Sequence, residues 1–177
     1  SKRDAYPLPR LDQCLDALGG NNRWFSTLDM RSSYYQVAMK EGDANKTAFI
    51  CHRGQFQYRT MPMGLHNAPA TFQRLMDLIM SGLLFETCLV YLDDIVIFSR
   101  TLEEHLQRLE LVLQRLAATG LKLKPSKCKL LQRRVVFLGH IISDEGIATD
   151  PSKTEQVAQW PVPKSVRDVR SYLGLCG

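Results

Sequence analysis

The sequence lacks several patterns that would place it in common classes of protein. Its five cysteines are odd in number, irregularly spaced and without a C-x-x-C pair, which argues against a disulfide framework or a zinc site. Free thiols are typical of a reducing compartment, so an intracellular protein is expected. There is no signal peptide and no apolar run long enough to cross a membrane, so no membrane partner is expected.

Glycine-rich phosphate loops are also absent. Neither G-x-x-x-x-G-K-S/T nor G-x-G-x-x-G occurs, which excludes a nucleotide held in the Walker or Rossmann manner. No Ser-His-Asp or Cys-His arrangement is evident either. The scattered histidines are expected to be structural or on the surface rather than catalytic, namely His52, His66, His105 and His140.

The composition that is present favours a globular protein with a basic surface. The chain has 177 residues, 45% hydrophobic and 23% charged, with a net charge of +5. This length suits one domain, or one domain with parts of its neighbours. A basic balance fits a nucleic-acid partner, although charge alone describes many other proteins. The stronger hint is that basic residues gather late in the chain, at Lys122, Lys124, Lys127, Lys129, Arg133 and Arg134.

Hydrophobic periodicity predicts short strands alternating with amphipathic helices. Apolar residues at helical spacing predict helices over residues 11–18, 69–83, 101–119 and 165–173. Runs rich in β-branched and aromatic residues predict strands over 24–30, 47–51, 55–60, 88–91, 95–98, 135–142 and from 147 onward. The expected fold class is α+β, a split βαβ core with helices on one face of a mostly antiparallel sheet.

Three aspartates stand at the polar ends of apolar strands. Asp93 and Asp94 lie between two runs that should pair as a hairpin, and Asp29 ends another strand. Aspartate is a common turn residue, so the pair alone has an ordinary explanation. If Asp29 lies beside the hairpin, however, the carboxylates repel one another, by about 4 kcal/mol for two charges about 4 Å apart at an effective dielectric of about 20.

A divalent cation would turn that repulsion into binding. Oxygen ligands without nearby histidine or cysteine favour magnesium over zinc. Two such ions suit phosphoryl transfer, because one lowers the pKa of an attacking hydroxyl and the other stabilises the leaving pyrophosphate.

Five segments in a fixed order resemble the motifs of reverse transcriptases, most closely those of gypsy-class LTR retrotransposons, with retroviral enzymes as more distant relatives. The segment Phe25–Tyr34 resembles motif A, Met61–Gln73 motif B, Tyr91–Asp94 the Y-x-D-D of motif C, Gly120–Lys129 motif D, and Phe137–His140 the primer grip. Any one of these could arise by chance, whereas five in order are specific. The resemblance implies an RNA-directed DNA polymerase that transfers a deoxynucleotide to a primer 3′-OH.

The same resemblance implies roles for individual residues. The catalytic carboxylates, which would bind two magnesium ions or manganese as a substitute, are Asp29, Asp93 and Asp94. The incoming dNTP would contact Met30, Arg31, Ser32, Ser33, Tyr34, Met63, Gly64 and Lys127. The primer and template would contact Gln73, Tyr91, Leu92, Leu138, Gly139 and His140.

Two of these roles have competing explanations. Tyr34 would exclude the ribose 2′-OH and so favour deoxynucleotides, but it could also be a packing residue. Lys127 would contact the triphosphate or assist departure of pyrophosphate, but it could also be a solvated lysine. Met63 departs from the aromatic residue common in this class, and Tyr35 from the histidine, so nucleotide selectivity and fidelity could differ.

The resemblance further implies a domain plan. Residues 1–36 would form an extended leading segment and the first part of the palm, 37–68 a fingers insertion, 69–148 the palm and 149–177 the start of the thumb. The chain would be a fragment of a larger Pol polyprotein, with thumb, connection, RNase H, protease and integrase, and inactive without full fingers and thumb. The expected location is a cytoplasmic retroelement particle, with the nucleus as an alternative.

Two other functions stay open. A non-catalytic retroelement remnant could bind RNA, because the split βαβ core resembles RNA-recognition modules, although all three aspartates are present and the aromatic-rich pattern of those modules is absent. An RNA-dependent RNA polymerase is the second alternative. Tyr34 argues against it, because such an enzyme must admit the 2′-OH.

Overall fold

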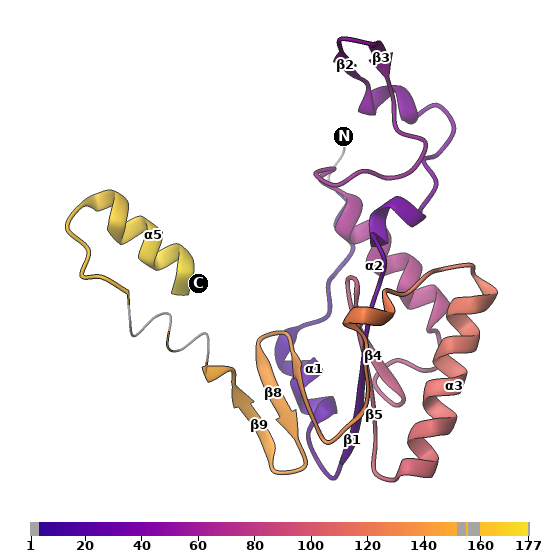
Figure 1. Ribbon diagram of the computed structural model, residues 1–177, viewed down its shortest axis with the longest axis vertical. Coiled ribbons are helices and arrows are strands. Elements are labelled where there is room, and N and C mark those ends of the chain that lie inside the picture. Colours follow the sequence, from indigo (N-terminus) through magenta and orange to yellow (C-terminus); the bar gives the residue numbers. More distant parts are fainter. Residues whose placement is uncertain (1–3, 152–154, 156–159, 177) are drawn as a thin grey trace.

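The computed structural model describes residues 4–151, 155 and 160–176 (Figure 1). Its helices are α1 (Leu11–Leu18), α2 (Ala68–Ile79), α3 (Leu102–Ala118) and α5 (Val166–Cys176), with short 3-10 turns η1 (Ser33–Gln36), η2 (Ala44–Thr47) and η3 (Pro125–Lys127). Its strands are β1 (Trp24–Asp29), β2 (Phe49–Cys51), β3 (Gly54–Phe56), β4 (Cys88–Tyr91), β5 (Asp94–Ser99), β6 (Lys129–Gln132), β7 (Arg134–Phe137), β8 (His140–Ser143) and β9 (Gly146–Thr149).

The central element is a four-stranded antiparallel sheet with the strand order β4-β5-β1-β6. The predicted hairpin of β4 and β5 is confirmed, but its turn has two residues rather than three, because Asp94 already pairs with Tyr91 as part of β5. The register places Asp29 directly opposite Asp94, and Asp94 opposite Tyr91. The strand ends that carry these polar side chains therefore lie together at one end of the sheet. We call this end, with Asp29, Asp93 and Asp94, the aspartate edge.

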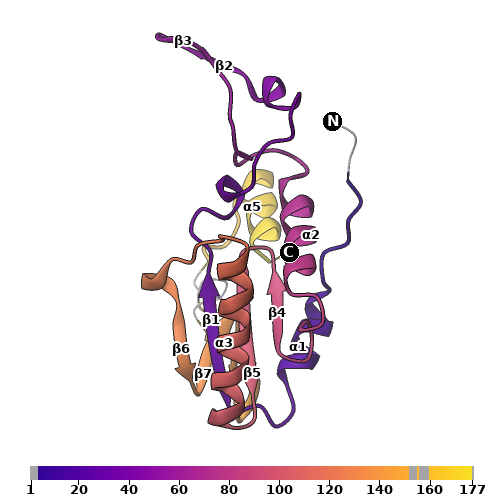
Figure 2. The same cartoon turned by 90° about the vertical axis from the view of Figure 1, so that its right-hand side faces the viewer.

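Alternating side chains of the central sheet enter two separate cores. On β5, Ile95 and Ile97 pack with α2 and α3, whereas Val96 and Phe98 pack with α1 and the three-stranded sheet β7-β8-β9. The helices α1 and α3 accordingly lie on opposite sides of the sheet (Figures 1 and 2). Each buried side chain of this size stabilises the fold by about 1.5–3 kcal/mol. The α+β class is confirmed, with α1 on the face opposite α2 and α3.

The ends of two helices follow the predicted chemistry. Pro69 stands in the first turn of α2, where its missing N–H is not needed. At α3, the Thr101 hydroxyl accepts from the Glu104 backbone N–H at 3.2 Å, and the Glu104 carboxylate accepts from the Arg100 N–H at 2.9 Å. These contacts fix where α3 begins behind the central hairpin.

The strand predicted over residues 135–142 is wrong as a single element. The structure divides it into β7 and β8, because Leu138 (φ 48°) and Gly139 (φ 76°) adopt left-handed backbone conformations and reverse the chain. The edge strand β6, which had no counterpart among the predicted strands, pairs with β1. The resulting β7-β8 hairpin faces the edge of the sheet that carries the aspartates.

Peripheral parts extend from this core. The predicted hairpin β2-β3 forms at the far end of the molecule from β8 and β9 (Figure 1). The region predicted to begin the thumb includes residues outside the described part of the chain, and the domain limits stay predictions. Within the described residues, no helix combines the length and apolar character needed to cross a bilayer.

Candidate active site

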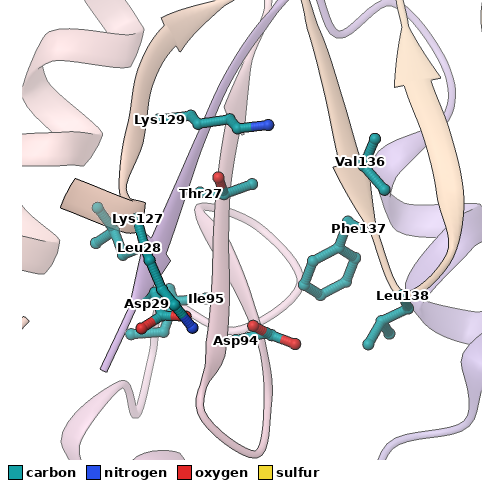
Figure 3. A pocket seen from close by; sticks show the side chains of 10 residues that line it. All are labelled: Thr27, Leu28, Asp29, Asp94, Ile95, Lys127, Lys129, Val136, Phe137 and Leu138. Carbon is teal, nitrogen blue, oxygen red and sulfur yellow. The ribbon is translucent and has the colours of Figure 1, made fainter. Parts of the chain in front are cut away.

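Two adjoining pockets meet at Asp29. The larger, of about 570 Å³, is lined by Asp29, Met30, Arg31, Ser32, Ser33, Met63, Asp93, Leu123, Lys124, Pro125 and Lys127. The smaller, of about 180 Å³, is lined by Thr27, Leu28, Asp29, Asp94, Ile95, Lys127, Lys129, Val136, Phe137 and Leu138 (Figure 3). The structure thus places Asp93 with the segment that follows Asp29, and Asp94 with the β7-β8 turn.

The carboxylates at this edge repel one another. Burial raises the pKa of Asp94, and the negative charges of Asp93 and Asp29 raise it further, while Lys127 opposes them. The ammonium of Lys127 lies 3.3 Å from Oδ2 of Asp29. Because both side chains of this pair are partly exposed, it contributes about 1 kcal/mol or less. One lysine therefore already lies within ion-pair distance of Asp29, while the Asp94 carboxylate stays under net repulsion from its acidic neighbours.

The donor set fits a hard divalent cation. Asp29, Asp93 and Asp94 offer only carboxylate oxygens, which magnesium prefers, and a cation would relieve the repulsion felt at Asp94. Among residues 4–151, 155 and 160–176, no three acidic, histidine or cysteine side chains already lie close enough to enclose an ion. The three aspartates are neighbours along a sheet edge rather than a closed cage.

The turn that carries Asp93 is held from behind by Gln73. Leu92 has a left-handed backbone (φ 55°), and its N–H donates to Oε1 of Gln73 at 2.7 Å. The amide nitrogen of Gln73 donates to the Val90 carbonyl at 3.1 Å. The Gln73 side chain is completely buried. It has no surface with which to contact primer or template, so we assign it to the support of this turn instead.

The backbone that follows Asp29 is tied to the segment around Lys122. The Lys124 N–H donates to the Asp29 carbonyl at 2.8 Å, and the Arg31 N–H donates to the Lys122 carbonyl at 2.9 Å. The side chain of Gln36 joins both segments, because its amide donates to the Arg31 and Lys122 carbonyls and accepts from the Lys122 N–H. Gln36 was not among the predicted residues, and no local pattern marks it, since its partner is 86 positions away.

Tyr34 lies close to the carboxylates without lining either pocket. Its ring packs edge-to-face on Phe72, with 5.7 Å between the ring centroids. Burial and the charge of Asp93 raise the pKa of the Tyr34 hydroxyl. The packing explanation for Tyr34 is therefore correct, and its nearness to Asp93 keeps the gate hypothesis as well.

The remaining predicted residues are divided between the two sides. Met63 is largely exposed in the larger pocket, and Gly64 follows it with a left-handed backbone (φ 89°). On the other side, Leu138 reaches the smaller pocket, and the His140 ring lies 3.1 Å from the Leu138 carbonyl within the β7-β8 turn. Of the predicted site residues, those that line neither pocket are Tyr34, Gly64, Gln73, Tyr91, Leu92, Gly139 and His140.

Comparison with known proteins decides the family. The model of the family described as "Reverse transcriptase (RNA-dependent DNA polymerase)" matches residues 2–142. The chain belongs to the reverse transcriptase family. This confirms the resemblance inferred from the five motifs.

Individual relatives agree with the gypsy class. The chain is 44% identical over 174 residues to the retrovirus-related Pol polyprotein from transposon 297 of Drosophila melanogaster, and 35% identical over 172 residues to that from transposon gypsy of the same species. These matches cover 98% and 97% of this chain. The chain spans 16% of the length of each of these two relatives.

Solved structures of a viral reverse transcriptase share the fold. The foamy viral protease-reverse transcriptase in complex with RNA/DNA hybrid matches with a TM-score of 0.85 and 24% identity, over 97% of this chain and 23% of that chain. The same viral protein in complex with dsDNA gives a TM-score of 0.85 over 99% of this chain and 36% of that chain. The sheet edge that carries the aspartates therefore belongs to a polymerase fold.

Proposed function

We propose that this chain is the catalytic core of an RNA-directed DNA polymerase, which adds deoxynucleotides to a primer 3′-OH. The observation that carries the proposal is the register of β1 and β5, which sets Asp29 opposite Asp94 beside the turn of Asp93. Residues far apart in the chain meet there in a member of the reverse transcriptase family.

In this proposal Asp29, Asp93 and Asp94 hold two magnesium ions, for which manganese can substitute. When bound, the ions lower the pKa of the primer hydroxyl and offset charge on the leaving pyrophosphate. The protein itself supplies position and fixed charge. The hydrogen bond from the Lys124 N–H to the Asp29 carbonyl holds the backbone at the first carboxylate. The Gln73 side chain holds the turn that carries Asp93, because its oxygen accepts from the Leu92 N–H.

The larger pocket is the proposed site of the deoxynucleotide. Its lining combines the backbone of Met30 to Ser33 with the ammonium groups of Lys124 and Lys127, which suit a triphosphate. Lys127 reaches both pockets, so it can exchange its partner Asp29 for a phosphate oxygen. Arg31 and Met63 complete the proposed contacts on this side.

The smaller pocket is the proposed site of the primer end. Leu138 and Phe137 approach Asp94 from the β7-β8 hairpin, and Lys129 adds a positive charge (Figure 3). Gly139 and His140 shape that turn, while Tyr91 and Leu92 lie beside it on the β4-β5 hairpin. A related viral enzyme has been solved with RNA/DNA hybrid and with dsDNA, and we propose the same partners here.

Contacts with a primer–template should be mainly to phosphate and sugar, because a polymerase must accept any sequence. Binding should weaken with salt as counterions are released. We further propose that the chain works within a Pol polyprotein that supplies the thumb, connection and RNase H, together with protease and integrase, in a cytoplasmic retroelement particle.

The deciding experiment is primer extension on an RNA template with magnesium, using the full-length polymerase and its Asp93→Asn variant. The loss of one carboxylate should reduce incorporation on the order of 1000-fold, because charge stabilisation carries the reaction. Asp12→Asn, which alters an exposed aspartate on α1, is the matched control. A folded, template-binding parent that extends no primer would favour the non-catalytic remnant.

The sugar preference is a separate prediction. Tyr34→Ala should raise incorporation of ribonucleotides relative to deoxynucleotides by about 100-fold, because the ring no longer excludes the 2′-OH. Tyr34→Phe should keep the preference, since it retains the ring. Tyr58→Ala is the control, because Tyr58 lines neither pocket and packs against Phe49 and Tyr35. An unchanged ratio in Tyr34→Ala would remove Tyr34 from the role of gate.

A further inference from the structure

A chain of hydrogen bonds joins the segment that precedes α1 to the catalytic turn. The Tyr6 hydroxyl donates to Oδ2 of Asp77 at 2.5 Å. Oδ1 of Asp77 accepts from the Gln73 amide at 2.8 Å, and Oε1 of Gln73 accepts from the Leu92 N–H at 2.7 Å. Tyr6 and Leu92 are far apart in sequence, yet only two side chains separate them.

Each link fixes the next one. The buried amide of Gln73 donates to both Asp77 and the Val90 carbonyl, so its oxygen must point toward Leu92. Asp77, one helical turn further along α2, uses one oxygen for Gln73 and the other for Tyr6. The position of the Tyr6 hydroxyl therefore restricts the rotation of both side chains behind the turn.

Polar contacts, rather than close packing, hold Tyr6 in place. The guanidinium of Arg74 lies 4.7 Å from the centroid of the Tyr6 ring and forms an ion pair with Asp4 at 2.7 Å. The Asp4 N–H donates to Oδ1 of Asn67 at 3.1 Å. A cavity of about 230 Å³ lies against residues 6–9, so the segment does not rest on a filled core there.

We propose that residues 4–9, which we call the strap, position the catalytic turn through Tyr6, Asp77 and Gln73. The proposal rests on the polymerase function and deepens it. Leu92 holds a left-handed backbone (φ 55°), which is strained for a residue with a side chain. The hydrogen bond from Gln73 offsets that strain, and Asp93 follows directly. Loss of the strap would let the turn relax and move Asp93 out of line.

The Tyr6 hydroxyl stays a donor at neutral pH. Its hydrogen bond to the Asp77 carboxylate, together with partial burial, raises the pKa of Tyr6 above its ordinary value. The Tyr6 hydroxyl therefore keeps its proton, and with it this hydrogen bond, near neutral pH.

The test uses the full-length polymerase with Tyr6→Phe, which removes one hydroxyl and keeps the ring beside Arg74. Turnover, kcat, should fall by about tenfold while KM for the deoxynucleotide stays within about twofold, because misplaced catalytic groups slow the chemical step and not binding. Hydrogen exchange of the Leu92 amide should accelerate by about tenfold, with the amide of Ile97 in β5 as the internal reference. Asp12→Asn should change none of these.

A second pair of variants separates positioning from simple loss of structure. Asp77→Leu breaks both contacts and should reproduce or exceed the effect of Tyr6→Phe. Asp77→Asn should restore most of kcat, because its amide oxygen accepts from Gln73 and its amide nitrogen donates to the Tyr6 oxygen. Equal kcat and equal Leu92 exchange in Tyr6→Phe and the parent would overturn the strap, as would faster exchange with unchanged kcat.

The outcome for the strap can be told apart from the outcome for the polymerase function. If the parent protein extends no primer, faster exchange of Leu92 in Tyr6→Phe still supports the strap, and the proposed function alone fails. If exchange of the Ile97 amide also accelerates in Tyr6→Phe, the variant has loosened the central sheet as well as the turn. The comparison of Asp77→Asn with Asp77→Leu then decides whether the strap positions the turn. Failure of Asp77→Asn to recover either slow exchange or turnover then overturns the strap.

Discussion

The central sheet carries two polar clusters, which differ in exposure and in how their charges and hydrogen bonds are matched. At one edge, Asp29 and Asp94 face each other across β1 and β5 with like charges. Deeper in the same two strands, Ser26 and Ser99 meet His105 of α3, and all three are completely buried. The first group is open to solvent in part and its like charges repel, whereas the second is enclosed and its hydrogen bonds are satisfied.

The hydrogen bonds of the buried group determine its protonation. The Ser99 hydroxyl donates to the Thr101 carbonyl at 2.9 Å, so it accepts from Nδ1–H of His105. The Leu131 N–H donates to Oγ of Ser26, which leaves the Ser26 proton for Nε2 of His105. Each polar hydrogen of this cluster has an acceptor when the imidazole is neutral. Burial, together with the positive charge of Arg108, lowers the pKa of His105 to about 4 against the opposing effect of Glu104.

The contrast separates stability from function. A buried polar cluster with every donor matched fixes α3 against β1, β5 and β6, and it has nothing left with which to bind a ligand. The aspartate edge keeps unpaired charge at the surface, which costs stability unless a cation or substrate arrives. Substitutions in the buried cluster should therefore lower the free energy of unfolding, whereas substitutions of the aspartates should mainly affect cation binding and activity.

The largest expected effect on stability is at the buried cluster. His105→Leu leaves the hydroxyls of Ser26 and Ser99 without their buried partner, which should cost about 4 kcal/mol of the free energy of unfolding. Denaturant unfolding followed by circular dichroism measures this. His52→Leu, in the exposed β2-β3 turn, is the control and should change little. A loss below about 1 kcal/mol in His105→Leu would mean that water replaces the imidazole.

The pH dependence of stability is the next largest effect. Because the folded protein holds the pKa of His105 at about 4 against an ordinary value of 6.5, the unfolded chain binds the extra proton between these values. The stabilisation is complete above pH 6.5 and should be lost as the pH falls toward 4, by about 3 kcal/mol. Unfolding curves from pH 7 to 4 measure it. Subtracting the curve of His105→Leu isolates the histidine, and equal pH slopes in the two proteins would contradict the assignment.

The smallest effect is of opposite sign and lies at the aspartate edge. Asp94→Asn removes a carboxylate whose pKa is raised by its neighbours, so the metal-free protein should become more stable. Because the Asp94 carboxylate is only partly desolvated and much of the residue is open to solvent, screening limits the gain to about 1 kcal/mol or less. Magnesium should raise the thermal midpoint of the parent more than that of Asp94→Asn. A lower midpoint for Asp94→Asn without metal would show that the edge is not under repulsion.

Local patterns in the sequence by themselves determined much of this protein. The caps of α2 and α3, the β4-β5 hairpin and the three aspartates are recorded in short stretches of chain, because they depend on neighbours a few residues away. The order of the five motifs sufficed for the family. The same patterns could not separate β7 from β8, because Leu138 in the turn is as apolar as the strands around it.

Only the tertiary structure decided which groups meet. The register of Asp29 with Asp94, the Gln36 bridge to Lys122 and the contact of His105 with Ser26 join residues 65 or more positions apart. Gln73, which the resemblance placed at the primer or template, is completely buried and accepts a hydrogen bond from the Leu92 N–H in the turn. A hydrogen bond between distant residues leaves no periodic signal in either segment, because its donor and acceptor become neighbours only when the sheet and helices have packed.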